Sequence, residues 1–166
     1  MTKHLAVQTP PSGPLVIPEN TCFAATWMWG IDQWRTVTGK SLQDLQTRYE
    51  TCQDRDQFFN TLLMHQNLQS KIQGTLTPWD IDLPNSPGFY MILLGLQNSF
   101  TGETVHHWIG ARKTQEEKFE LFNSRAEPLL QRFKTQEVLS QAIQNLVTEQ
   151  WGHFTLTTAW TITCFK

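Results

Sequence analysis

The feature that most constrains the fold is an apolar run from Gly88 to Leu96, which contains no charged residue. A strand with one face in water alternates apolar and polar side chains, whereas a near-continuous apolar run is typical of a strand buried on both faces. The run is far too short to cross a membrane as a helix. We therefore expect it to form the central strand of a sheet.

Apolar residues recur at helical spacing before this run. We expect helices over about residues 22–38, 41–52 and 54–63, with N-caps at Thr21, at Ser41 and at either Asp54 or Asp56. Gly39 is expected to end the first helix. The segment 74–87 carries one glycine and three prolines and is expected to be a loop.

Strand spacing follows the run. We expect strands over 104–112 and 117–123, then a helix over about 135–149. In the last segment the side chains of Phe154, Leu156, Trp160, Ile162 and Cys164 are expected to share one face of a strand, with threonines on the other. Helices followed by antiparallel strands, with one late helix, indicate the α+β class: an N-terminal helical layer packed on an antiparallel β-sheet.

Length and composition limit the remaining possibilities. The 166 residues are enough for one domain with a single core, which we assign to residues 21–166. Residues 1–20 contain four prolines and no secretory signal pattern, and they read as an extended lead-in. The net charge is −2 and no run of Lys and Arg occurs, so nucleic acid and stable membrane insertion are not expected. Three widely spaced cysteines suit a reducing compartment.

Three polar residues lie in otherwise apolar surroundings and indicate a chemistry. Cys22 opens the first expected helix, where the helix dipole is expected to lower a thiol pKa. His107 shares a strand face with Val105 and Ile109, whereas its neighbour His106 should point the opposite way. Asn123 ends the next strand and could meet His107 across a hairpin. A thiol, an imidazole and an orienting amide, meeting between the two layers, would form a cysteine-hydrolase triad.

Each of these three residues also has an ordinary structural interpretation. A cysteine among apolar residues is usually a small buried hydrophobe, a buried histidine can be a satisfied core residue, and Asn123 could simply be a turn residue. For catalysis, the oxyanion hole would need the Cys22 backbone N–H and a side-chain donor, for which Asn20 is the candidate. Trp29 and Trp108 flank the site in sequence and are expected to line a substrate cleft. No metal or cofactor motif is present, so none is expected.

At these residues the chain resembles the papain-like cysteine effectors of bacterial pathogens, which include the YopT/AvrPphB-type proteases and the OspI-type glutamine deamidases. In those families a Cys begins a helix, a His lies in a strand motif similar to the run 107–111, and an acid or amide ends the next strand. The interval from His107 to Asn123 is 16 positions (123 − 107), which suits that pattern. This chain departs from it in having Asn123 rather than Asp, no following Pro, and no Gly beside Cys22.

The resemblance implies a papain-like thiol hydrolase, either a cysteine protease or a Gln/Asn deamidase. It would be a bacterial effector or toxin, secreted through a specialised system and active in the target-cell cytosol. Its small size favours recognition of one folded target-cell protein, such as a small GTPase or signalling enzyme. An acyl-transfer reaction is a third reading. The alternative from another class is a non-catalytic interaction module (an adaptor, chaperone or immunity protein) with a buried Cys22.

Overall fold

The computed structural model describes most of the chain from Asn20 onward. The described residues are 17, 20–31, 39–54, 57–59, 61–62, 69–73, 88–114, 116, 118–126 and 128–165, with the side chains of 69–73 and 160–165 outside the description. Predictions that fall on the lead-in or on the loop 74–87 therefore lie outside the described residues, apart from Ile17 and Asn20 in the lead-in.

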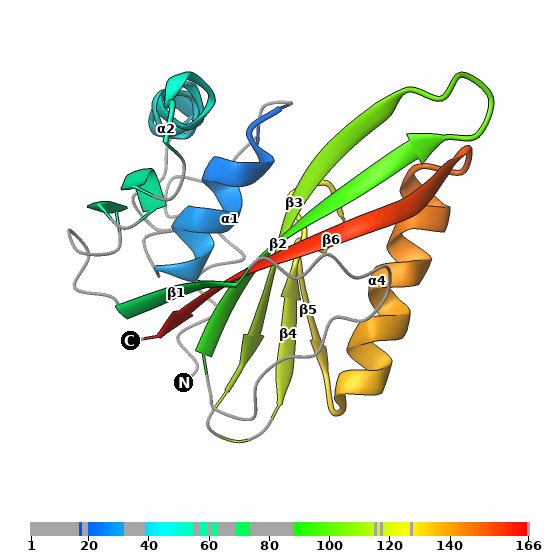
Figure 1. The fold of residues 1–166 in the computed structure, drawn as a ribbon. Coiled ribbons are helices and arrows are strands. Elements are labelled where there is room, and N and C mark those ends of the chain that lie inside the picture. The colour runs from blue at the N-terminus through cyan, green and yellow to red at the C-terminus, as the bar shows by residue number, and fades with distance from the viewer. Residues whose placement is uncertain are drawn as a thin grey trace.

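A six-stranded antiparallel sheet forms the centre of the molecule, as Figure 1 shows. Its spatial order is β1 (Gln69–Gln73), β6 (Phe154–Phe165), β2 (Gly88–Asn98), β3 (Thr104–Lys113), β4 (Phe119–Phe122) and β5 (Leu130–Phe133). The apolar run lies in β2, a central strand with buried residues on both faces, as predicted. Strands β1 and β5 were not predicted from the sequence, because both are short and show no clear apolar alternation.

Helices cover the two faces of the sheet and give two hydrophobic clusters. On one face lie α1 (Cys22–Gly30) and α2 (Gly39–Thr51), with the α1 side chains packed between α2 and the sheet. On the other face lies α4 (Gln136–Gln150), which begins at the N-cap Thr135 and matches the predicted late helix. The expected class, α+β with helices N-terminal to an antiparallel sheet, is confirmed.

The first helix ends earlier than predicted. It stops at Gly30 rather than residue 38, and the N–H of Ile31 closes it on the carbonyl of Trp27. The ring of Phe89 packs against Gly30, and a Cβ at this position would require that ring to shift. Gly39 does not end this helix; it is the first residue of α2. The predicted Ser41 cap is therefore wrong as well.

Two further predictions are refined by the backbone. Residues 57–59 and 61–62 are helical, and the carboxylate of Asp54 accepts the Gln57 N–H at 3.0 Å, which makes Asp54 the N-cap. The strict alternation predicted for the last strand is wrong, because a bulge shifts the β2–β6 register beside Leu96. Leu156 and Ala159 consequently lie in the same cluster although they are three residues apart.

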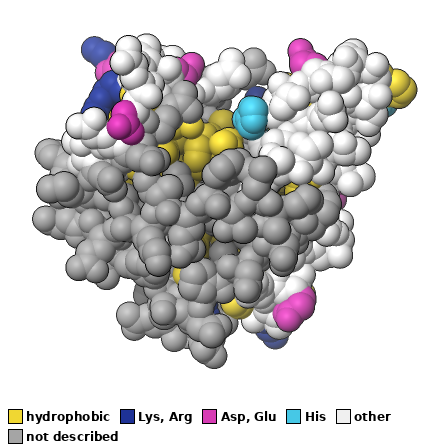
Figure 2. All heavy atoms as spheres, in the orientation of Figure 1, with side chains coloured by type: hydrophobic (Ala, Val, Ile, Leu, Met, Phe, Trp, Pro, Cys, Tyr) yellow, Lys and Arg dark blue, Asp and Glu magenta, His cyan; other side chains and the backbone are white. Residues whose placement is uncertain are grey.

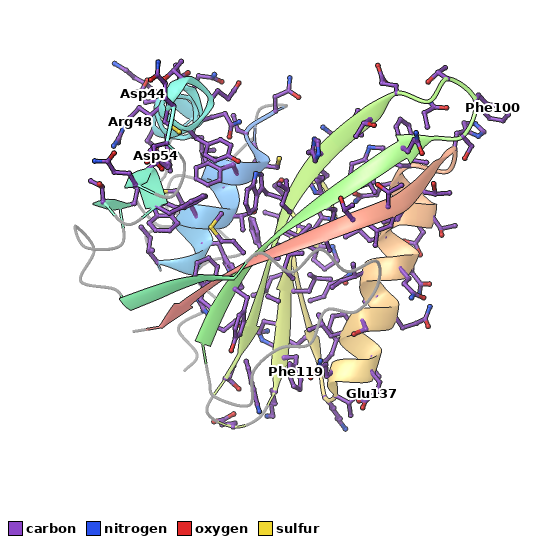
Figure 3. All side chains as sticks on the ribbon, in the orientation of Figure 1. Asp44, Arg48, Asp54, Phe100, Phe119 and Glu137 are labelled. Carbon is purple, nitrogen blue, oxygen red and sulfur yellow. The ribbon has the colours of Figure 1, made fainter. Side chains whose placement is uncertain are left out.

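The β2–β3 hairpin extends past the helices. Its turn contains Gly102 with φ of 75°, a conformation that favours glycine. Phe100 at its tip points away from the body of the molecule, as Figure 3 shows. Within the described ranges, no helix has the length and apolar character that crossing a membrane requires.

Candidate active site at the open edge of strand β3

The first turn of α1 lies along an edge of β3 that β4 leaves open. The last β3–β4 pair is Gly110 with Phe122, so β3 continues beyond its neighbour. At Trp108 the backbone N–H donates to the Cys22 thiol at 3.5 Å, and the backbone carbonyl accepts the Thr26 hydroxyl at 3.4 Å. Since the N–H and C=O of one strand residue point to the same side, both bonds place α1 where β4 would otherwise pair.

The other end of α1 is held by a buried arginine of β3. The Arg112 guanidinium donates to the carbonyls of Trp29 and Gly30 at 3.3 and 3.1 Å, and it lies over the Trp29 ring. A cation at a helix C-terminus is favourable, and here Glu120 of β4 lies 3.7 Å away to balance its charge. Strand β3 thus fixes both ends of the helix that carries Cys22.

His107 and Asn123 meet across the β3–β4 hairpin. The Nε2 atom of His107 lies 2.8 Å from the Asn123 amide oxygen, and both side chains are buried. The same oxygen accepts the backbone N–H of Arg125 at 3.1 Å. Because a backbone N–H can only donate, this atom must be the oxygen, and His107 Nε2 must carry the proton. The basic lone pair of His107 is therefore on Nδ1.

The C-terminal end of α4 supports this pair. The Asn123 amide N–H donates to the Gln150 side-chain oxygen at 3.3 Å, and Gln150 in turn donates to the Arg125 carbonyl at 2.9 Å. The Trp151 ring packs against the His107 imidazole, with centroids 4.9 Å apart. Both the oxygen and the nitrogen of the Asn123 amide are thus engaged, and the plane of the imidazole is fixed from a second element.

Burial sets the protonation of both candidate catalytic groups. It raises the pKa of the Cys22 thiol, although the backbone N–H groups of Trp108, Phe23 and Cys22 act in the opposite direction. Burial also lowers the pKa of His107 to about 4, against a smaller opposing effect of the Asn123 bond. The expected lowering of the thiol pKa by the helix is therefore wrong, because desolvation outweighs it. At neutral pH the resting pair is a thiol and a neutral imidazole.

Two clefts meet at Cys22. The first, of about 350 Å³, is lined among others by His107, Arg125 and Trp151. The second, of about 440 Å³, lies toward α2 and is lined among others by Tyr49 and Trp108. Cys22, Asn20 and His106 line both. Figure 2 shows hydrophobic side chains at the surface beside a histidine, between α2 and the β2–β3 hairpin. An extended ligand could therefore pass the sulfur on both sides.

The structure brings together most of the residues singled out from the sequence. Cys22 and His107 line one cleft, and Asn123 bonds to His107. They do not meet between the two layers as expected, because His107 lies on the α4 face, whereas Cys22 lies at the edge of β3, and the two line the same cleft.

Of the three other residues predicted for the site, two line a cleft and one does not. Asn20 adopts a left-handed conformation with φ of 64° and lines both clefts, and Trp108 lines the second. The prediction for Trp29 is wrong: its side chain is fully buried between Phe89 and Phe122 and lines neither cleft.

Three residues around this site were not predicted from the sequence: Arg125, Gln150 and Trp151. Gln150 and Trp151 lie at the end of the predicted late helix, but no local pattern indicated that this end lies against His107. No family model and no curated protein matches the chain. Within the described ranges, no group of three or more His, Cys, Asp or Glu side chains could hold a metal ion. The assignment of function thus rests on the geometry of the site.

Proposed function

We propose that this protein is a papain-like thiol hydrolase that acts on a protein substrate through Cys22, His107 and Asn123, as a cysteine protease or a Gln/Asn deamidase. The observation that carries the proposal is the bond from His107 Nε2 to the Asn123 oxygen. This bond leaves Nδ1 as the basic nitrogen of His107, and His107 lines the same cleft as the half-buried Cys22 thiol. An orienting amide, a base and a nucleophile are the parts that such chemistry requires.

In this mechanism the Cys22 thiol gives its proton to His107 Nδ1 as the sulfur attacks the substrate carbonyl carbon. The C–N bond then breaks, and the imidazolium returns the proton to the leaving nitrogen. Water attacks the resulting thioester after losing a proton to Nδ1, and the Cys22 thiol is regenerated. Because the resting pair is neutral, His107 acts as a general base during the attack.

The oxyanion would be held at the N-terminus of α1. Thr21 occupies the N-cap but its side chain makes no capping bond, so it does not block the first N–H groups of the helix. The backbone N–H groups of Cys22 and Phe23 lower the pKa of the thiol, so they lie close to the sulfur that would attack. The Cys22 N–H and the Asn20 side chain, which lines both clefts, are the donors we assign to this role.

The resemblance to bacterial effectors supplies the biological part of the proposal. The protein would be delivered by a specialised secretion system and would act in the cytosol of a target cell. Its substrate there would be one folded protein, of a kind such as a small GTPase or a signalling enzyme. A reducing cytosol would keep the nucleophile as a thiol, and Cys22 and Cys52 are both free.

Alkylation of Cys22 and Cys52 by iodoacetamide, followed by peptide mass spectrometry, tests the proposal. Cys52 lies just after α2 and is an internal reference in the same sample. At pH 7 we expect Cys22 to react faster than Cys52. We also expect His107→Ala to slow the reaction at Cys22 at least tenfold without changing Cys52, because the base is lost. His153→Ala, which removes an exposed histidine that lines neither cleft, is the matched control.

The second candidate is the non-catalytic interaction module. It is favoured by the direction of both pKa shifts, since burial holds the thiol and the imidazole neutral as in an ordinary core. If Cys22 reacts no faster than Cys52, or if His107→Ala leaves its rate unchanged, this reading replaces the hydrolase.

A further inference from the structure

The two clefts at Cys22 differ in their access to the general acid. His107 lines the first cleft, and it does not line the second. In amide cleavage the imidazolium must reach the nitrogen that leaves. The leaving group of the substrate therefore belongs in the first cleft, and the acyl part belongs in the second, toward α2.

The first cleft is large for the leaving group of a deamidation. Ammonia is about the size of water, which takes roughly 30 Å³ in the liquid. The first cleft has a volume of about 350 Å³. Its walls include the apolar side chains of Val105, Trp151 and Phe154, which would contact an organic group and not a lone ammonia molecule. This volume suits an amino-acid residue as the leaving group.

Arg125 supplies the charge in this cleft. Its side chain is exposed and lines the cleft, and it forms no ion pair with any residue of the described part of the chain. Its backbone is held on both sides, by the Asn123 oxygen at the N–H and by Gln150 at the carbonyl. The guanidinium is close enough to influence both Cys22 and His107 electrostatically. Because its backbone is held in place and its guanidinium is exposed, Arg125 is suited to binding a carboxylate.

We propose that the hydrolase is a peptidase rather than a deamidase, and that Arg125 binds a carboxylate on the leaving peptide. The carboxylate is either an Asp or Glu side chain or the C-terminus of a short leaving segment. This inference rests on the proposed function and narrows it. Arg125 is a specificity-determining residue in this account, because it contacts the substrate away from the reacting atoms.

Acyl transfer tests the inference without knowledge of the natural substrate. p-Nitrophenyl acetate acetylates Cys22: the thiol proton passes to His107 and then to water, the sulfur bonds to the acetyl carbon, and p-nitrophenolate leaves. An added amine then attacks the thioester carbon, its proton passes through His107 to the departing sulfur, and an N-acetyl amide forms. By microscopic reversibility, this amine must occupy the leaving-group cleft. The ratio of acetamide product to acetate therefore reports binding there.

Four peptide acceptors separate the sources of charge. Gly-Gln-amide is neutral, Gly-Glu-amide carries a side-chain carboxylate, Gly-Gln free acid carries a terminal carboxylate, and Gly-Lys-amide carries a cation. In the wild type we expect at least one carboxylate acceptor to outcompete the neutral one about fivefold or more. The acceptor that does so identifies the source. Ammonium chloride is the fifth acceptor, and we expect every dipeptide to exceed it at equal concentration of free amine.

Variants assign the effect to Arg125. We expect Arg125→Gln to abolish the carboxylate preference, Arg125→Glu to turn it toward Gly-Lys-amide, and Arg125→Lys to keep part of it. Arg48→Gln removes the same charge from α2, on the opposite side of α1 from the sheet, and should keep the full preference (Figure 3). Because the Arg125 side chain is exposed, the melting temperature should not change in any variant.

The outcomes separate the two proposals. If wild-type Cys22 is not acetylated, the hydrolase proposal fails and this inference fails with it. If Cys22 is acetylated but carboxylate acceptors gain nothing, or keep their advantage in Arg125→Gln, only the inference is overturned. If ammonia matches the dipeptides, a deamidase fits better and the peptidase choice is overturned.

Discussion

The backbone N–H of Trp108 bonds to the Cys22 thiol, and the residue just before it, His107, sends its imidazole into the cleft that the same thiol lines. One stretch of β3 therefore positions both the proposed nucleophile and the proposed base. Helix α1 is held to β3 at Cys22, one turn later at Thr26, and at its C-terminal end by Arg112. The relative position of Cys22 and His107 is set by this helix–strand interface.

Removal of the Asn123 amide should weaken His107 as a base. In Asn123→Ala the Nε2–H of His107 and the N–H of Arg125 lose their common acceptor, and the imidazole is free to turn or change tautomer. We expect the rate of Cys22 acetylation by p-nitrophenyl acetate to fall by about ten- to a hundredfold. Asn123→Asp keeps the acceptor and should retain more activity than Asn123→Ala. Asn145→Ala, an exposed change on α4, should match the wild type.

Acid should destabilise the folded protein through His107. Its pKa falls from 6.5 to about 4 on folding, so below pH 6.5 the unfolded chain binds a proton that the folded protein refuses. Stability from this group is thus complete above pH 6.5 and is lost as the pH falls toward 4. The loss is about 2.5 kcal/mol at pH 4.5.

Urea unfolding at pH 7.5 and pH 4.5 measures this loss. We expect the free energy of unfolding to fall less in His107→Gln than in the wild type, by about that amount, because Gln keeps a donor for Asn123 but cannot titrate. His106→Gln controls for removal of an exposed imidazole. Equal falls in the wild type and His107→Gln would mean that His107 is not held neutral by burial.

Trp151 should determine how strongly His107 is desolvated. Its ring packs on the imidazole and lines the first cleft, so Trp151→Ala would admit water to the ring. We expect the pKa of His107 to rise from about 4 toward 6.5 in this variant. The acid limb of the acetylation rate should then move to higher pH, while Trp151→Phe stays near the wild type. An unmoved limb with a lower rate throughout would indicate loss of structure instead of a change in desolvation.

Local patterns predicted β2, β3 and α4, and the pairing of His107 with Asn123, because strand alternation and a short hairpin fix which side chains share a face. They did not predict that α1 ends at Gly30, where the Phe89 ring of another element packs against the backbone. They also misplaced Trp29: α1 is apolar on every side, so no polar stripe marks the face toward the cleft. The proposed role of Arg125 could not be predicted locally, because its backbone is held by Asn123 after β4 and by Gln150 at the end of α4, both distant in sequence from Cys22.

The close contact between α1 and β3 should depend on Gly110. A Cβ there would lie 2.6 Å from the Trp29 ring and 3.1 Å from the Thr26 methyl group. Trp29 cannot yield, because its ring is stacked on Phe122 and lies under the Arg112 guanidinium. We expect Gly110→Ala to lower the free energy of unfolding by about 1–3 kcal/mol.

The same displacement of α1 would move the sulfur away from the base, so Cys22 acetylation in Gly110→Ala should slow even under conditions where the protein is fully folded. Gly39→Ala is the matched control, because no atom of the described residues lies within 4 Å of a Cβ at the start of α2. It should leave both stability and acetylation unchanged. Wild-type acetylation in a folded but destabilised Gly110→Ala protein would show that the α1–β3 contact serves stability alone and does not position Cys22.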